Sequence, residues 1–331
     1  MAPTLAIPLF VVALAVTLTA AATFARRLDR LGARFGLPEV LIGLLTAVAA
    51  DGPEVSSAVA ALVKGAHEAG VGVIVGSNVF NLAAMIGVSA LLAGGVQIPR
   101  RTLILEGTAA VAITATAIAL LAGWLSAPLA VGVIACILAP YLILVLGGRR
   151  VAERLRLGWL AKRVIEDDPE GHPMEGRSDA AAHFATHRQV MLMALDLVLI
   201  IAGSIGMVQA ALALGDRWGI RQALVGVLVL GPLTSLPNAL TGVRLGLARR
   251  GAALVTEALN SNSINLVAGV AVPSLFVTLA ARSRIDRLDL VLLAATTAAV
   301  LGLLAMRGGV RRLGGAIVIL LYAVFVLVEF V

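Results

Sequence analysis

The 331-residue sequence has little of what a soluble or secreted protein needs. Only 14% of its residues are charged and 4% are aromatic, whereas 60% are hydrophobic. Soluble domains carry about 25% charged residues, so this composition excludes an ordinary soluble domain, a disordered chain and a coiled coil. A single cysteine, Cys136, excludes an intrachain disulfide and a zinc site built from the cysteines of one chain. We therefore expect the chain to have lipid as its main solvent.

Sequence motifs of common enzymes are missing as well. The chain contains no HExxH zinc motif, GxSxG nucleophile elbow, Walker loop or GxGxxG fingerprint. Ser204 lies in an apolar stretch, but the histidines lie in or near polar connections, so an intramembrane serine hydrolase is not expected. We expect a protein that is not an enzyme and uses no cofactor.

Long apolar stretches are what the sequence has in abundance. A membrane-spanning helix needs about 20 apolar residues. Ten suitable stretches lie near residues 4–24, 37–63, 71–94, 102–122, 129–147, 190–213, 222–247, 252–280, 289–306 and 313–330. We therefore predict an all-α integral membrane protein with ten transmembrane helices. The first stretch is similar to a signal peptide, but Arg26, Arg27 and Arg30 follow it and no basic residue precedes it, which favours an uncleaved helix.

Basic residues between these stretches indicate the orientation of the chain in a membrane. Numbered along the chain, the odd connections lie near residues 26–34, 97–101, 149–189, 249–251 and 307–312, and the even ones near 64–68, 123–128, 216–222 and 282–289. With Arg244 counted in the seventh, the odd connections hold 20 of the 26 lysine and arginine residues. Basic residues in short loops collect on the cytoplasmic side. We expect a bacterial inner-membrane protein with both termini outside and the 149–189 loop in the cytoplasm, although the eighth connection, with three arginines, does not fit this pattern.

Two segments of the chain repeat each other at a fixed offset of 184 residues. The matched pairs are Pro53 and Pro237, Glu54 and Asn238, Ser57 and Thr241, Ser77 and Ser261, Asn78 and Asn262, and Asn81 and Asn265. The first segment, about 37–94, belongs to residues 1–148, and the second, about 220–280, belongs to residues 190–331. Each half holds five stretches, and five is an odd number. The second half should therefore cross the membrane in the opposite sense, which predicts two inverted five-helix repeats.

Proline and polar side chains at matched positions within apolar helices are typical of a secondary transporter with a site at the membrane midplane. Pro53 and Pro237 each lack a backbone N–H and so free nearby carbonyl oxygens. Asp51 and Glu54 are three residues apart, so they share one face of a helix. Carboxylate, hydroxyl, amide and carbonyl oxygens suit sodium or calcium better than soft transition metals. For serine and threonine, close helix packing is an equally good explanation.

Carboxylates within the apolar stretches carry the strongest functional signal. An ionised carboxylate at the centre of a membrane helix costs about 2.5–3.5 kcal/mol, and such residues mark ion or proton pathways. We interpret Glu54 in this way, and Asp51 as a ligand, a proton carrier or the partner of a ligand. Glu106 and Asp196 lie near the ends of their stretches, where an interfacial charge is expected. Glu257 lies deeper in the second repeat, and a place on the pathway stays open for it.

Two motifs in each repeat carry a resemblance to a known family. They read Asp51-Gly52-Pro53-Glu54 and Gly76-Ser77-Asn78-Val79-Phe80-Asn81, then Leu233-Thr234-Ser235-Leu236-Pro237-Asn238 and Asn260-Ser261-Asn262-Ser263-Ile264-Asn265. They resemble the alpha-repeats of the cation/calcium exchanger superfamily, which includes sodium/calcium exchangers. The resemblance implies ten helices in two inverted halves and a central site that exchanges calcium for sodium, protons or potassium. The ligands that it implies are Glu54, Ser77, Asn81, Thr234, Ser235, Asn238, Ser261 and Asn265, completed by the carbonyls of Ala47 and Gly231.

The site departs from the family pattern in its carboxylates. Asn238 and Asn265 stand where family members commonly or often have acidic residues, whereas Asp51 is an additional carboxylate. Ionised Asp51 and Glu54 balance one divalent or two monovalent cations, and their mutual repulsion favours retention of a proton. We expect an antiporter that exchanges Ca²⁺ for Na⁺ or H⁺ by alternating access. The alternatives are a channel with the same ligands and a relative that senses cations without transporting them.

The longest connection, residues 149–189, is expected to be a solvated linker between the two halves. It contains the acidic run 166–170 and the histidines His172, His183 and His187. A regulatory metal site or a pH sensor is the alternative, but no EF-hand loop or close histidine spacing is present. The expected partners of the whole chain are transported cations and the lipid bilayer, and no nucleic acid.

Overall fold

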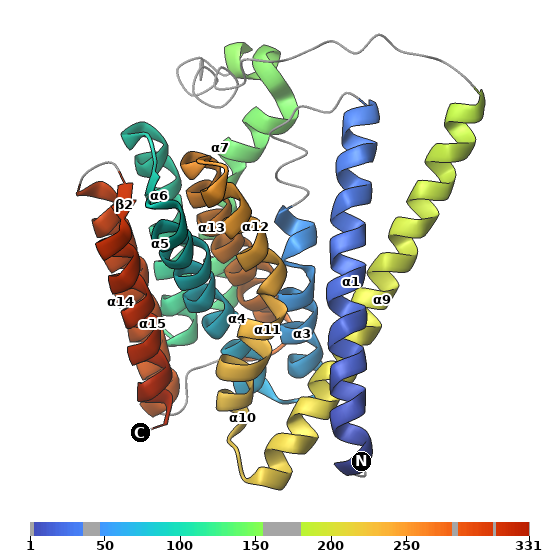
Figure 1. The fold of residues 1–331 in the computed structure, drawn as a ribbon, viewed down its shortest axis with the longest axis vertical. Coiled ribbons are helices and arrows are strands. Elements are labelled where there is room, and N and C mark those ends of the chain that lie inside the picture. The colour runs from blue at the N-terminus through green and yellow to red at the C-terminus, as the bar shows by residue number, and fades with distance from the viewer. Residues whose placement is uncertain (1–2, 36–46, 155–179, 280–283, 307–308, 331) are drawn as a thin grey trace.

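The computed structural model describes residues 3–35, 47–154, 180–279, 284–306 and 309–330, most of which are helical (Figure 1). The first half contains α1 (Pro3–Phe35), α3 (Gly52–Val63), α4 (His67–Asn81), the π-helical η1 (Leu82–Val88), α5 (Ser89–Ala93), α6 (Arg100–Leu121) and α7 (Ala127–Arg154). The second half begins with α9 (Ala180–Trp218), α10 (Gln222–Leu224), the π-helical η2 (Val225–Leu230), α11 (Gly231–Thr234) and α12 (Leu236–Leu247). It continues with α13 (Gly251–Leu266), the π-helical η3 (Val267–Ala271), the 3₁₀ turn η4 (Pro273–Leu275), α14 (Arg284–Ala305) and α15 (Arg312–Glu329).

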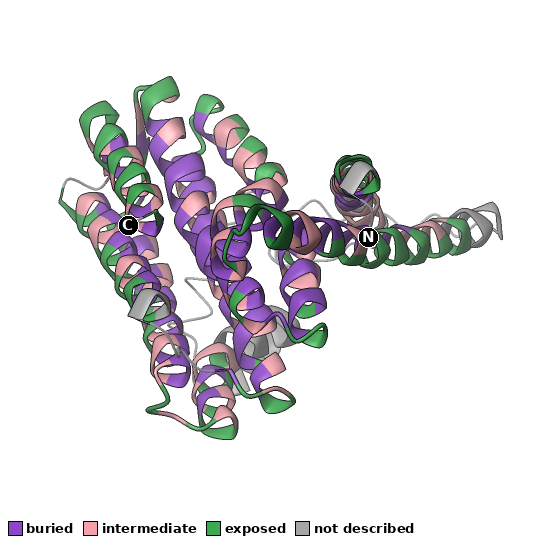
Figure 2. Cartoon of the chain, turned by 90° about the horizontal axis from the view of Figure 1, so that it is seen from below, coloured by how far each residue is buried: buried purple, intermediate pink, exposed green. Residues whose placement is uncertain are grey.

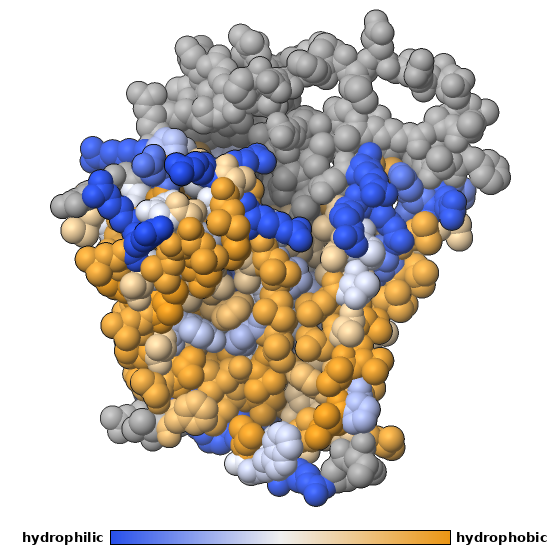
Figure 3. Space-filling view, viewed as in Figure 1, coloured by the Kyte–Doolittle hydropathy of each residue, from blue (hydrophilic) through white to orange (hydrophobic). Residues whose placement is uncertain are grey.

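The outer surface of the helices is apolar, as expected for an integral membrane protein. Leu240, Leu247 and Leu320 are each about 60% exposed, and Figure 3 shows a hydrophobic band with hydrophilic residues gathered at its two ends. Among the described residues, six helices are long and apolar enough to cross a membrane, or seven if the bent pair Gln222–Thr234 and Leu236–Leu247 is one span. Helix length and hydropathy therefore support a membrane protein and leave the predicted count of ten open.

The two repeats have the same backbone plan. Adding 184 to the bounds of α3 gives the bounds of α12, and adding it to the first residue of α4 gives the first residue of α13. The turns between these helices agree as well, because Ala66 has φ −83° and ψ 63° and Arg250 has φ −91° and ψ 56°. The sequence repeat is therefore also a repeat of structure.

Close contacts fix the relative directions of these helices. Gly70 of α4 packs against Leu62 near the end of α3, which makes the two helices antiparallel. Gly72 faces the carbonyl of Ala223, and Ser77, further along α4, faces Gly231, so α4 runs parallel to the segment α10 to α11. The helix α3 is therefore antiparallel to α11, which continues into α12.

Odd-numbered connections, which we assign to one side of the membrane, lie together in the structure. The strand β1 (Gly95–Gln97) pairs antiparallel with β2 (Gly309–Arg311), which joins the third connection to the ninth. Gly251 of the seventh connection packs against the backbone of Gln97. Three-residue strands inside short polar connections carry no sequence signal, so the all-α prediction misses this ribbon.

The predicted 149–189 linker is helical at both of its ends. The helix α7 continues to Arg154 and α9 begins at Ala180, so His183 and His187 belong to a 39-residue helix rather than to a loop. Residues 155–179, with His172 and the acidic run, lie outside the described residues. The helices α1 and α9 pack along each other and stand to one side of the other helices (Figure 2).

Candidate cation site

The site begins where two helices are interrupted at equivalent positions. Asp51 precedes α3 with φ −79° and ψ −2°, and its counterpart Ser235 precedes α12 with φ −82° and ψ 1°. Pro53 and Pro237 lie in the first turns of these helices, where a missing N–H is tolerated. The second interruption bends the chain by 47°. Each break directs the positive end of a helix dipole toward the interior, which favours the nearby carboxylates.

Glycine allows the two repeats to approach closely enough to share this site. A Cβ atom on Gly76 of α4 would clash with the carbonyl oxygen of Val227, and one on Gly231 would lie 2.7 Å from the backbone nitrogen of Ser77. Side chains from α3, α4, α11, α12 and α13 consequently meet in one cluster. Its polar members, each at most 5% exposed, are Asp51, Glu54, Ser77, Asn78, Asn81, Thr234, Ser235, Asn238, Ser261, Asn262 and Asn265.

Asn238 connects the two carboxylates. Its Nδ2 donates to Oδ1 of Asp51 at 2.7 Å and to Oε1 of Glu54 at 3.0 Å. The hydroxyl of Ser261 donates to the same Asp51 oxygen at 2.5 Å, and Asn81 donates to the oxygen of Ser261 at 3.1 Å. We predicted Asn238 as an oxygen ligand, whereas in this arrangement its N–H groups face acceptor oxygens of the two carboxyl groups. The amide nitrogen therefore lies between two oxygens that a cation would bind.

A second group of amides joins α4 to α13. Asn78 donates from Nδ2 to the backbone oxygen of Asn262, and Asn262 donates in the same way to Asn78, both at 3.1 Å. Asn265 donates to Oδ1 of Asn78 at 3.2 Å. The ligand prediction omits Asn78 and Asn262, although their 184-residue offset marks them as a pair. Their reciprocal bonds tie the two repeats together beside the carboxylates.

Several oxygen atoms of the cluster have no hydrogen-bond partner among the described residues. They are Oδ2 of Asp51, Oε2 of Glu54, Oγ of Ser235, and Oδ1 of Asn81, Asn262 and Asn265. Buried acceptors of this kind cost free energy when they are left unpaired. Two come from carboxylates and four from neutral groups, which is the donor set that hard cations bind.

The remaining predicted ligands are bonded along their own helices. Ser77 donates to the carbonyl of Ile74 at 3.0 Å, and Thr234 donates to Leu230 at 2.8 Å. The carbonyl of Ala47 accepts from the backbone of Asp51 at 3.0 Å. The Gly231 carbonyl accepts from Ser235 and from Thr234 at 3.2 Å and 3.0 Å. Gly231 therefore already uses its carbonyl twice, whereas each hydroxyl and the Ala47 carbonyl keep acceptor capacity.

The other carboxylates of the apolar stretches do not belong to this hydrogen-bonded group. Asp196 of α9 is buried and forms an ion pair with Arg27 of α1, and it accepts a hydrogen bond from Thr23 at 3.0 Å. Asp196 therefore joins α1 to α9 through an ion pair in which Asp196 is buried and Arg27 is partly exposed. Glu106 lies half-buried on α6. Glu257 of α13 is half-buried and lies within electrostatic range of Asp51.

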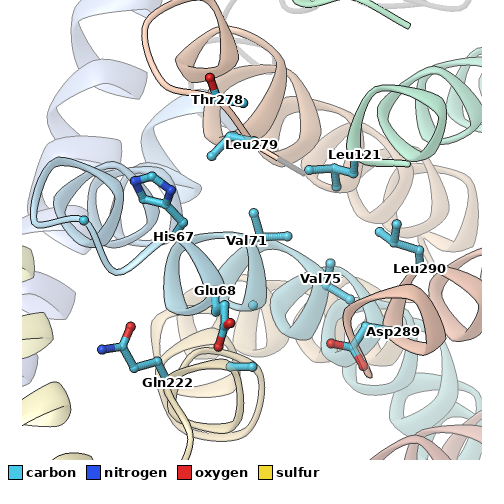
Figure 4. Close-up of a pocket in the computed structure, with 13 residues that line it drawn as sticks. His67, Glu68, Val71, Val75, Leu121, Gln222, Thr278, Leu279, Asp289 and Leu290 are labelled. Carbon is cyan, nitrogen blue, oxygen red and sulfur yellow. The ribbon is translucent and has the colours of Figure 1, made fainter. Parts of the chain in front are cut away.

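A separate pocket of about 380 Å³ lies beside the first turns of α4 (Figure 4). Its lining includes His67 and Glu68 of the second connection, Gln222 of the sixth, Asp289 of the eighth and Leu121 before the fourth. It shares no residue with the polar cluster. The pocket brings together residues of the second, sixth and eighth connections, which we assign to the same side of the membrane, and the end of α6.

No group of three or more histidine, cysteine, aspartate or glutamate residues that could hold a metal ion occurs in the described segments. The two carboxylates of the cluster must therefore act together with neutral oxygens.

Comparison with known proteins agrees with the geometry. Residues 5–147 and 189–331 match the family model described as sodium/calcium exchanger protein. CaxA of Alkalimonas amylolytica, whose description as an antiporter is itself provisional, is 36% identical over 67 residues, which span 20% of this chain and 21% of CaxA.

Solved structures show the same fold. The sodium–calcium exchanger NCX_Mj superposes with a TM-score of 0.60 at 17% identity over 98% of this chain and 99% of its own. Native YfkE superposes with a TM-score of 0.67 at 12% identity over 97% and 91%. The family model covers most of both halves, so the chain belongs to the sodium/calcium exchanger protein family, and its apolar helices are those of an integral membrane protein.

Proposed function

We propose that this protein is a secondary active antiporter that exchanges Ca²⁺ for Na⁺ or H⁺ at the buried polar cluster. The observation that carries the proposal is the buried cluster in which Asn238 contacts both Asp51 and Glu54, together with the carboxylate and amide oxygens of the cluster that lack a hydrogen-bond partner among the described residues. Calcium takes about 6–8 oxygen ligands, of which carboxylates supply the charge. Two ionised carboxylates balance one Ca²⁺, two Na⁺ or two protons, so the same groups can serve either side of an exchange.

Cation entry requires a rearrangement of Asn238. Its nitrogen donates to Asp51 and Glu54, so a cation that binds both carboxylates has to displace these N–H groups. Rotation of the terminal amide would turn the oxygen of Asn238 toward the ion and restore the predicted ligand role. In the arrangement described here, the Asn238 amide contacts both carboxyl groups and offsets their mutual repulsion.

The proposed architecture is ten transmembrane helices in two inverted five-helix repeats. The antiparallel packing of α3 on α4, together with the parallel course of α4 and α11, supports the inversion. The grouping of the third, seventh and ninth connections at the β ribbon supports alternate crossing, as does the grouping of even connections at the pocket beside α4. We propose that the halves are residues 1–148 and 190–331, with alpha-repeats near 37–94 and 220–280. The basic odd connections face the cytoplasm of a bacterial cell, and both termini face outside.

We expect alternating access to use α1 and α9, which pack on each other at the edge of the bundle and contact the core helices mainly through α3. The reciprocal bonds of Asn78 and Asn262 hold α4 and α13 together, whereas α1 and α9 form a pair at the edge of the bundle (Figure 2). We expect this pair to move against the core and open the site to each side in turn.

Uptake of Ca²⁺ into proteoliposomes tests the proposal. The full-length protein is reconstituted with an outward Na⁺ gradient, with an outward proton gradient, or with neither. Uptake that requires one gradient supports exchange and identifies the counter-ion. Uptake of equal rate without a gradient would indicate a channel, and absence of uptake together with retained Ca²⁺ binding would indicate a cation sensor.

A further inference from the structure

A hollow of about 570 Å³ lies at the β-ribbon end of the molecule, away from the polar cluster. Arg249 follows α12, Arg311 ends β2, and Arg312 begins α15, and all three are exposed and line this hollow. The rest of the lining comes from the ribbon and from Gly246 and Gly251. None of the described residues that line it is acidic. Three arginines therefore line one space, and no acidic residue among its described lining balances their charge.

Arg249 has an unfavourable backbone conformation. Its φ of 59° is the one positive φ of a non-glycine residue in the described chain. The equivalent position of the first repeat is Gly65, with φ 77°. This conformation destabilises the protein when the residue has a Cβ atom, whereas glycine adopts it freely. The second repeat thus keeps a large basic side chain where the backbone favours glycine, which indicates that the side chain itself has a use.

The ribbon leaves the guanidinium groups accessible. Gly94 and Gly95 have φ values of 85° and 157° and carry no side chain over the hollow. A Cβ atom on Gly94 would lie 3.9 Å from Nε of Arg312, so the guanidinium lies beside this glycine. Within the described chain, none of the three arginines forms an ion pair. Guanidinium groups bind phosphate oxygens through paired hydrogen bonds, so the hollow suits a phosphate group.

Exposed leucines are the sequence neighbours of lining residues in α5, α12 and α15. Leu92 precedes a lining residue of α5, Leu247 follows a lining residue of α12, and Leu313 follows Arg312 in α15. They are 55%, 59% and 77% exposed. At this end of the molecule Figure 3 shows hydrophilic residues directly above the hydrophobic surface. A free phosphate ion would use only the arginines, whereas a phospholipid would also cover the leucines.

We propose that Arg249, Arg311 and Arg312 bind the phosphate of an anionic phospholipid whose acyl chains lie against the leucines of α5, α12 and α15. Basic pockets at the cytoplasmic face of membrane helices attract anionic headgroups. The bound lipid would link α12 and α13 of the second repeat to the ribbon. This proposal does not depend on which cations the protein transports.

Lipid binding to the purified full-length protein tests the proposal. Native mass spectrometry in detergent compares phosphatidylglycerol with phosphatidylcholine of the same acyl chains. The variant Arg249→Gln/Arg311→Gln/Arg312→Gln should bind phosphatidylglycerol at least about tenfold more weakly. The control Arg26→Gln/Arg30→Gln/Arg188→Gln removes three exposed arginines from other odd connections and should bind it like the unchanged protein.

A single substitution provides a second test in case the triple variant misfolds. Arg249→Gly relieves the backbone conformation, so it should keep the fold and still bind phosphatidylglycerol more weakly. Equal binding of the two lipids, equal losses in both triple variants, or unchanged binding by Arg249→Gly would each overturn the proposal. Complete displacement of phosphatidylglycerol by millimolar inorganic phosphate would also overturn it, since the site would then be one for a small anion.

Discussion

Substitution of Asn238 by aspartate would convert the central hydrogen-bond donor of the site into a third carboxylate. The side chain keeps its shape, but the N–H groups that bond Asp51 at 2.7 Å and Glu54 at 3.0 Å are lost. A carboxylate oxygen would take the place of the amide nitrogen. The cation-free site would then contain three acidic groups in contact, with no donor between them.

The magnitude follows from the two lost bonds. A hydrogen bond to a charged group contributes about 1.5–3 kcal/mol, so their loss should cost about 3–6 kcal/mol in the cation-free protein. Proton uptake by the new cluster would recover part of this free energy. Native proteins are stable by about 5–15 kcal/mol, so a large drop in Tm is expected without Ca²⁺ or Na⁺. Bound Ca²⁺ should restore stability, because a third carboxylate adds to its attraction.

Thermal unfolding followed by tryptophan fluorescence would measure both effects. Asn238→Asp should unfold at a lower temperature than the unchanged protein in chelator, and its Tm should rise more steeply with Ca²⁺. Asn238→Leu is the matched control, because it removes the donor without adding charge and should show the loss but no enhanced rescue. An Asn238→Asp variant with the same Tm in chelator and the same Ca²⁺ response as the unchanged protein would refute the bridging role of Asn238.

Two further predictions concern how the helices are held. Gly76→Ala places a methyl group against the carbonyl of Val227, so we expect α4 to separate from η2. The Tm should fall by several degrees, and cations should no longer stabilise the protein. An unchanged unfolding curve would contradict the close approach of these two helices. Arg27→Leu leaves the buried Asp196 without its cation and should cost about 1–3 kcal/mol, since Arg27 is partly exposed. Adding Asp196→Asn in the same chain should recover much of that loss in a double-mutant cycle, and strictly additive losses would mean that the pair does not stabilise the contact.

Much of the site could be predicted because the repeat constrains it. The 184-residue offset and the helix-breaking prolines place Glu54 opposite Asn238 without any knowledge of the fold, and the structure brings these two side chains into contact. The direction of the Asn238 amide could not be predicted, because it depends on which acceptors surround it. The role of Asn78 and Asn262 depends on backbone carbonyls of the other repeat, which sequence spacing does not locate.

The fold likewise has features that could be predicted from the sequence and features that could not. Apolar stretches locate the helices well, since lipid exposure imposes a compositional signal. The helical ends of the 149–189 connection were harder to predict, because α9 begins among polar residues such as His183 and His187. The ion pair of Asp196 with Arg27 joins residues far apart in sequence, so hydropathy alone interprets Asp196 as an interfacial charge.

The central claim is that Asp51 and Glu54 carry the charge of an exchanged cation, and gradient-driven Ca²⁺ uptake by two matched variants tests it most directly. Glu54→Gln removes one charge from the buried cluster, whereas Glu106→Gln removes the same charge from a membrane helix outside it. We predict that Glu54→Gln lowers uptake by more than about tenfold, since a divalent ion is left with one balancing charge. Glu106→Gln should transport at close to the normal rate. Normal uptake by a correctly inserted Glu54→Gln variant would contradict the account.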